Sequence, residues 1–187
     1  GTPTEYFLHE DQTEGIAKAD FMAASKKGVL PTSNAITMVF KHMMTKVVVN
    51  VDNESGSEIE TLEIDGSPVA ADIDIAEMTV SDFTGNLVDE SPAPVKAYEA
   101  ADGSKWQAII IPGTSKLTIS IYLSNGKKIS QPLAEMTLKS GGQYTVNVRI
   151  VEDNMIVSAS GEIENWTDEG EIEFDGEGTT EEETVEF

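Results

Sequence analysis

The chain contains no cysteine among its 187 residues and only two histidines. The absence of cysteine excludes disulfide bonds, thiolate metal sites and cysteine nucleophiles, and it leaves the redox compartment undetermined. No apolar run approaches the ~20 residues that a membrane-spanning helix needs, and the N-terminus lacks the basic and apolar regions of a signal peptide. We therefore expect a protein that is either cytosolic or secreted with its signal removed.

Positive charge is scarce as well. Twelve Lys and Arg residues stand against 34 Asp and Glu residues, which gives a net charge of −22 at pH 7. Nucleic acids and anionic membrane surfaces attract cationic proteins, so this charge argues against both as partners. The charge is also uneven, because no Lys or Arg follows Arg149 while 14 of the acidic residues lie from Ile150 onward. Such an acidic end is typical of a solvated tail.

Catalytic and metal-binding patterns are equally scarce. His42 has the same strand parity as Met38 and Phe40, which favours a hydrogen-bonded packing role over that of a general base. His9 is followed by Glu10 and Asp11, so the simplest interpretation is a solvent-exposed histidine paired with a neighbouring carboxylate. The acidic clusters lack the residue spacing of a helix-loop-helix calcium site. Residues 168–175 allow weak binding of a divalent ion, but a solvent-exposed acidic surface is the preferred interpretation. We predict no enzyme, no cofactor and no metal site.

The aromatic residues, 6% of the chain, allow one binding hypothesis. Aromatic rings bind the apolar faces of sugars, so an exposed group of Tyr98, Trp106 and Tyr122 would indicate a module that binds carbohydrate or a host ligand. Because these residues and Trp166 are dispersed along the chain, core packing of Trp106 is the preferred interpretation.

Residues 36–51 form the most apolar stretch of the chain and predict a central strand. One inward face carries Ile36, Met38, Phe40, His42 and Met44, whereas Val47, Val49 and Val51 continue on the opposite parity. An inward face that slips by one residue at Thr45 and Lys46 indicates either one strand bent at a bulge or two linked strands.

Alternation of apolar and polar residues predicts further strands at 58–65, 69–75, 106–111, 117–123 and 144–150. Asn125 and Gly126 predict a type I′ hairpin turn after the fourth of these. Residues 89–104 are expected to be loop, because Pro92 and Pro94 oppose a central strand. Residues 14–25 suit a helical turn or two.

Five segments in order resemble the fimbrillin-like proteins of gut and oral Bacteroidales, and they run DFMAA (20–24), VFKHMMTKVVV (39–49), IIP (110–112), GQYTV (142–146) and IENW (163–166). We take Phe40, His42, Tyr144 and Trp166 as their structural motif. The resemblance implies a pilus or adhesin subunit at the cell surface, made as a secreted lipoprotein precursor. It further implies transthyretin-like sandwich domains and assembly by strand exchange, in which a strand of one subunit completes a groove in its neighbour after proteolysis.

These observations together predict an all-β chain with a transthyretin-like, Greek-key β-sandwich. We expect a helical or irregular N-terminal segment at 1–35, the sandwich at 36–168 and an acidic extension at 169–187. The signal and lipidation segment are expected to lie outside this chain. Expected partners are other pilus subunits, with host proteins or glycans as further candidates. The candidate assembly strand lies in the extension, where apolar residues recur at strand spacing: Ile172, Phe174, Val185 and Phe187.

Overall fold

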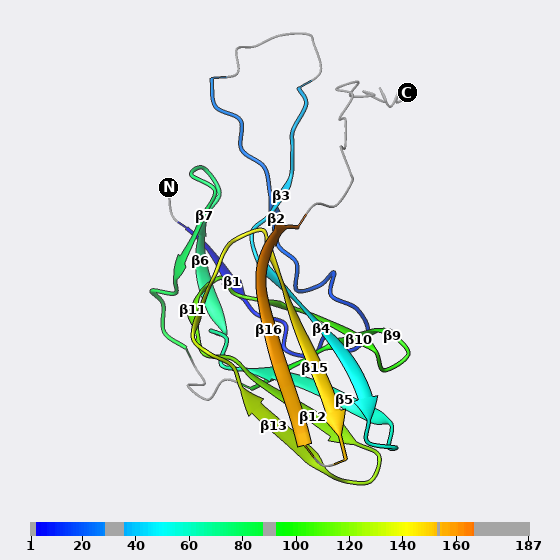
Figure 1. Cartoon of the computed structure of the whole chain (residues 1–187). Coiled ribbons are helices and arrows are strands. Elements are labelled where there is room, and N and C mark those ends of the chain that lie inside the picture. The colour runs from blue at the N-terminus through cyan, green and yellow to red at the C-terminus, as the bar shows by residue number, and fades with distance from the viewer. Residues whose placement is uncertain (1–2, 29–35, 88–92, 153, 167–187) are drawn as a thin grey trace, which may run out of the picture.

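The computed structural model describes residues 3–28, 36–87, 93–152 and 154–166, and for 157–165 it describes the backbone alone. Every regular element in these ranges is a β-strand (Figure 1). None of the described residues forms a helix that could cross a membrane. The all-β prediction is therefore confirmed.

Two larger sheets form the body of the molecule. The first has the order β16-β15-β4-β10-β9, and the second has the order β13-β12-β5-β8. The strands of the first sheet are β4 (Thr45–Glu54), β9 (Tyr98–Ala101), β10 (Lys105–Ile110), β15 (Gly142–Val151) and β16 (Asn154–Asn165). Those of the second are β5 (Ile59–Asp65), β8 (Val95–Lys96), β12 (Thr118–Leu123) and β13 (Lys128–Pro132).

Three smaller sheets complete the fold. β1 (Thr4–Phe7), β6 (Ala70–Asp74) and β7 (Thr79–Asp82) form a three-stranded sheet in the order β1-β6-β7. β2 (Met22–Ala23) pairs with β3 (Lys41–His42), and β11 (Gly113–Ser115) pairs with β14 (Met136–Leu138).

The core lies between the two larger sheets. In the first sheet, Val47 of β4 lies between Ala108 of β10 and Tyr144 of β15 in the strand register, and all three are buried. The alternating residues of the second sheet face them, so one apolar cluster joins both layers. Its second-sheet members include Leu62, Ile64, Ile119, Ile121 and Leu123.

Residues 36–51 differ from the predicted central strand. β3 is short, the chain bends at Met44, and β4 begins only at Thr45, so two linked strands is the correct alternative. The predicted inward face fails at Ile36 and Phe40, which are 38% and 39% exposed. These residues lie beyond the end of the sheet, in a projection that rises from β2 and β3 in Figure 1. We call its described residues, 24–28 and 36–40, the arm.

Residues 14–25 contain one turn, in which Ala19 N donates to Ile16 O over 3.1 Å. The loop expected at 89–104 needs correction, because it contains β8 and β9. There, pairing with neighbouring strands decides the structure and local propensity does not.

The hairpin at Asn125 and Gly126 joins β12 to β13 as predicted, but the turn type is different. Only Gly126 has a positive φ, 81°, and its N–H donates to Leu123 O over 2.9 Å. A type I′ turn needs positive φ at both central residues, so this is a type I turn followed by a left-handed glycine. That geometry gives a three-residue loop with a bulge.

Candidate functional site

The root of the arm brings together two members of the predicted motif. His42 ends β3 and is buried, and its ring stacks on the indole of Trp166, with ring centroids 3.5 Å apart and planes at 9°. Its Nδ1 lies 2.8 and 3.0 Å from the two carboxylate oxygens of Asp20. The side-chain ammonium of Lys46 lies 5.3 Å from the centre of the Trp166 ring.

Short hydrogen bonds hold residues 139–142 on the bend between β3 and β4. Ser140 Oγ donates to Met43 O and Thr45 Oγ1 donates to Lys139 O, each over 2.8 Å. Gly141 N donates to Met44 O, and Gly141 O accepts from Trp166 N, each over 2.9 Å. The bend, the start of β15 and the end of β16 therefore form one continuous hydrogen-bonded junction.

The other two motif residues lie elsewhere. Tyr144 is buried in β15, and its hydroxyl donates to Thr137 O over 2.7 Å. Phe40 lies on the arm and is partly exposed. The structure thus joins His42 with Trp166 and leaves Phe40 apart from them.

The N-terminal segment crosses the edges of both larger sheets. Lys96 N donates to Glu10 O and Gln12 N donates to Lys96 O, so residues 10–12 extend the second sheet beyond β8. The side chain of Gln12 is fully buried, and its amide pairs with β10 of the first sheet. Gln12 Nε2 donates to Ile109 O and Ile109 N donates to Gln12 Oε1, each over 2.8 Å.

Gln12 is a residue that sequence reasoning missed. It lies in the polar run Glu10-Asp11-Gln12-Thr13, where nothing in the pattern separates it from its solvated neighbours. Its amide acts as a substitute for a strand's peptide group, because it satisfies both backbone groups of Ile109 beyond the end of β9. Tyr6 OH, which donates to Ala19 O over 2.5 Å, holds the same segment further along.

The outer edge of the first sheet is β16. It pairs with β15 on one side and is the last strand in the sheet order. The pairing is regular from Asn154 to Ser160, and a bulge then shifts the register before Glu164. The candidate assembly residues Ile172, Phe174, Val185 and Phe187 lie outside the described residues, so their role stays a prediction.

The described residues contain no group of three or more His, Asp or Glu side chains that could hold a metal ion. Asp72 of β6 is buried, and Thr84 donates to its carboxylate from both N and Oγ1, over 3.1 and 2.6 Å. His9 is exposed and lies beside Asp11, whose pKa is lowered by the side-chain and backbone hydrogen bonds from Thr13. This arrangement offers no buried acid and base pair around His9.

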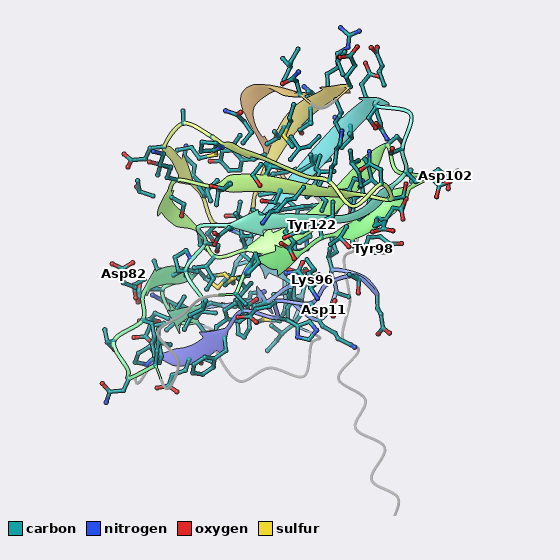
Figure 2. The ribbon with its side chains drawn as sticks, turned by 90° about the horizontal axis from the view of Figure 1, so that it is seen from below. Asp11, Asp82, Lys96, Tyr98, Asp102 and Tyr122 are labelled. Carbon is teal, nitrogen blue, oxygen red and sulfur yellow. The ribbon has the colours of Figure 1, made fainter. Side chains whose placement is uncertain are left out.

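Tyr98, Trp106 and Tyr122 do not form an exposed aromatic platform. Trp106 is 3% exposed, and its Nε1 donates to Gly103 O over 3.2 Å. Tyr98 and Tyr122, both labelled in Figure 2, are partly buried on strands of different sheets. The Tyr122 hydroxyl donates to Glu63 over 2.7 Å, and Lys128 lies over the ring. The sugar-stacking arrangement around Trp106 is therefore not present.

Comparison with known proteins identifies the fold. A putative cell adhesion protein from Bacteroides uniformis superposes with a TM-score of 0.56 at 18% sequence identity, covering 71% of this chain and 54% of that protein. A second putative cell adhesion protein, from Bacteroides ovatus, superposes with a TM-score of 0.56 at 19% sequence identity, covering 72% of this chain and 49% of that protein. The chain thus spans about half the length of these two structures. At these identities the likeness shows the fold alone.

No curated protein matches the chain. The sequence profile of one family, described as fimbrillin-like, matches residues 1–166. This match spans the sandwich, the arm and the N-terminal segment, and it ends at Trp166, where the described residues also end. The chain belongs to the fimbrillin-like family.

Proposed function

We propose that this chain is a structural subunit of a cell-surface pilus or adhesin, and that it assembles with other pilus subunits by β-strand addition. Family membership supports the pilus or adhesin subunit, a surface or extracellular location and a role without catalysis. The proposal extends to export as a lipoprotein precursor to the outer membrane, and to host proteins or glycans as further partners.

The observation that carries strand addition is the outer edge of β16. Edge strands expose unpaired N–H and C=O groups that accept another strand, and β16 presents a regular run of such groups from Asn154 to Ser160. Within the described part of the chain, β15 is the strand that pairs with it. The donor is the C-terminal extension, in which Ile172 and Phe174, then Val185 and Phe187, recur at strand spacing.

Burial of the four apolar side chains favours such an addition. One large apolar side chain contributes roughly 1.5 to 3 kcal/mol, so four contribute about 6 to 12 kcal/mol toward the conformational entropy lost when the segment is ordered. The acidic residues between them alternate to the other face, where water solvates them.

The test compares two tail variants with the full chain by light scattering after size-exclusion chromatography. In the first, Ser replaces Ile172, Phe174, Val185 and Phe187. In the matched control, Gln replaces Glu177, Glu181, Glu182 and Glu183. We expect the first variant to lose oligomers, as does deletion of residues 171–187, and the control to keep them. Unchanged assembly in the first variant and in the deletion would overturn strand addition by this segment.

A further inference from the structure

The arm combines several lysines with exposed apolar residues. Exposed Ile156 also has a cation beside it, Arg149 on the neighbouring strand, but Arg149 is paired with Glu54 and Asp52. Residues 21–51 contain four lysines and no Asp or Glu, in a chain with 34 acidic residues. On the arm, Val39 is 61% exposed, with Phe40 and Ile36 at 39% and 38%. A surface that is both basic and apolar fits a partner that is both acidic and apolar.

Two of the lysines near the arm have their charge unmatched by carboxylates of the described residues. Lys27 pairs with Glu77 over 2.6 Å, which fixes the arm against the β6–β7 turn together with the bond from Ser25 Oγ to Ala76 O. Lys26 instead donates to the backbone carbonyl of Thr37 over 3.2 Å, and Lys41 is exposed at the arm's root. These two ammonium groups remain able to attract an anion.

The last described residue, Trp166, lies at the root of the arm. Trp166 is stacked on His42, directly below the arm, and residues 167–187 follow it. This segment, which we call the tail, has ten acidic residues, no Lys or Arg, and four large apolar residues. Twenty-one residues reach up to ~70 Å when extended, and a tethered segment has an effective concentration in the millimolar range.

We propose that the arm binds the tail of the same chain, with Lys26 and Lys41 meeting tail carboxylates and Val39 and Phe40 covered by tail apolar residues. The contact is made by side chains within one subunit, so it does not depend on strand addition between subunits. Where strand addition also operates, the contact shields the donor residues until a neighbouring subunit competes for them.

The test measures the distance between arm and tail by fluorescence energy transfer. Because the chain has no cysteine, Thr37→Cys and Thr180→Cys provide two unique labelling sites. The test variant carries K26E and K41E, and the matched control carries K105E and K116E at exposed positions outside the arm, with the same change in net charge. Circular dichroism checks that all variants fold.

We expect high transfer in the parent and the control, and loss of that transfer in the test variant. About 1 M NaCl shortens the Debye length to ~3 Å, so it should also reduce transfer in the parent. As a second variant, amides in place of Glu171, Glu173, Asp175 and Glu177 should have the same effect as the lysine reversal. Asn125 belongs to the loop between β12 and β13, and these strands lie at the end of the molecule away from the arm in Figure 1. A label at Asn125 should therefore show low transfer to Thr180 in every variant.

Equal transfer in the test variant and the control would overturn the proposal. Transfer that appears only when singly labelled chains are mixed, and that rises with protein concentration, would assign the tail to a second copy and would also overturn it. Failure here is distinguishable from failure of the proposed function, because dilute samples report the contact within one chain and light scattering reports assembly.

Discussion

The imidazole of His42 lies parallel to the indole of Trp166, with 3.5 Å between ring centroids. His42 belongs to β3 and Trp166 directly follows β16, far away in sequence, and Asp20 binds the edge of the same imidazole at Nδ1. Three segments of the chain therefore meet at one buried ring. A ring in this position holds the point from which the tail leaves the domain.

Substitution of His42 by Leu should destabilise the fold by about 2 to 4 kcal/mol. The change removes the bond to the Asp20 carboxylate, and it replaces a flat stacked ring by a branched side chain. Urea unfolding measures the difference in the free energy of unfolding. His9→Leu is the matched control, since His9 is exposed, and it should stay within about 0.5 kcal/mol of the parent. Equal losses in both variants would contradict the structural role of the His42 ring.

Gln12→Leu should cost about 2 to 4 kcal/mol, because it leaves both backbone groups of Ile109 without their partner in a buried place. Amide hydrogen exchange gives the sharper measurement, and the Ile109 amide should exchange much faster in the variant. Gln131→Leu serves as the control, since the Gln131 amide makes only a long 3.4 Å bond to Pro132 O. Unchanged exchange at Ile109 would show that the Gln12 amide is dispensable.

Tyr6 should make the fold sensitive to alkali. Burial, assisted by the negative charge of Asp20, raises the pKa of the Tyr6 hydroxyl above its ordinary value. A raised folded-state pKa means that this contribution to stability is complete below pH ~10, the unfolded-state pKa, and is lost as pH rises toward the folded-state pKa. Tyr6→Phe removes this loss, although it also removes the bond to Ala19 O at every pH.

The measurement for Tyr6 is urea unfolding of the parent and Tyr6→Phe at pH 7 to 11. The parent should be the more stable at pH 7, by about 1 kcal/mol for the lost hydrogen bond, and its advantage should shrink above pH ~10. Tyr122→Phe is the comparison, because the Tyr122 hydroxyl is on the surface side of β12 and bonds to Glu63. A constant difference across the pH range would contradict the burial of the Tyr6 hydroxyl.

The strands were the most predictable feature of this chain. β12 and β15 each bury one face, so their apolar residues alternate and the sequence reveals both strand and face. The hydrophobic pattern around Phe40 wrongly predicted a buried face, because apolar content does not show whether a neighbouring strand is present to cover it. The arm extends beyond β2 and β3, and there Ile36 and Phe40 meet water.

The junction at His42 was less predictable. Parity placed His42 on an inward face, yet its two contacts come from Asp20 and Trp166, and their approach depends on strand order, which periodicity does not encode. Nothing in the sequence marks Gln12, because a glutamine that hydrogen-bonds to the β10 backbone cannot be told from a surface glutamine by its sequence neighbours. Tertiary placement alone gives these polar residues their roles.

The parallel pairing of β4 with β15 has a consequence for how the molecule is made. Asn50 of β4 bonds to Asn147 of β15, 97 residues later in the chain. The centre of the larger sheet therefore cannot close until nearly the whole domain has left the ribosome or the secretion channel. Contacts at such separation slow folding and leave the apolar face of β4 unprotected meanwhile. A partner that covers β4, or rapid arrival of β15 and β16, would shorten this exposure.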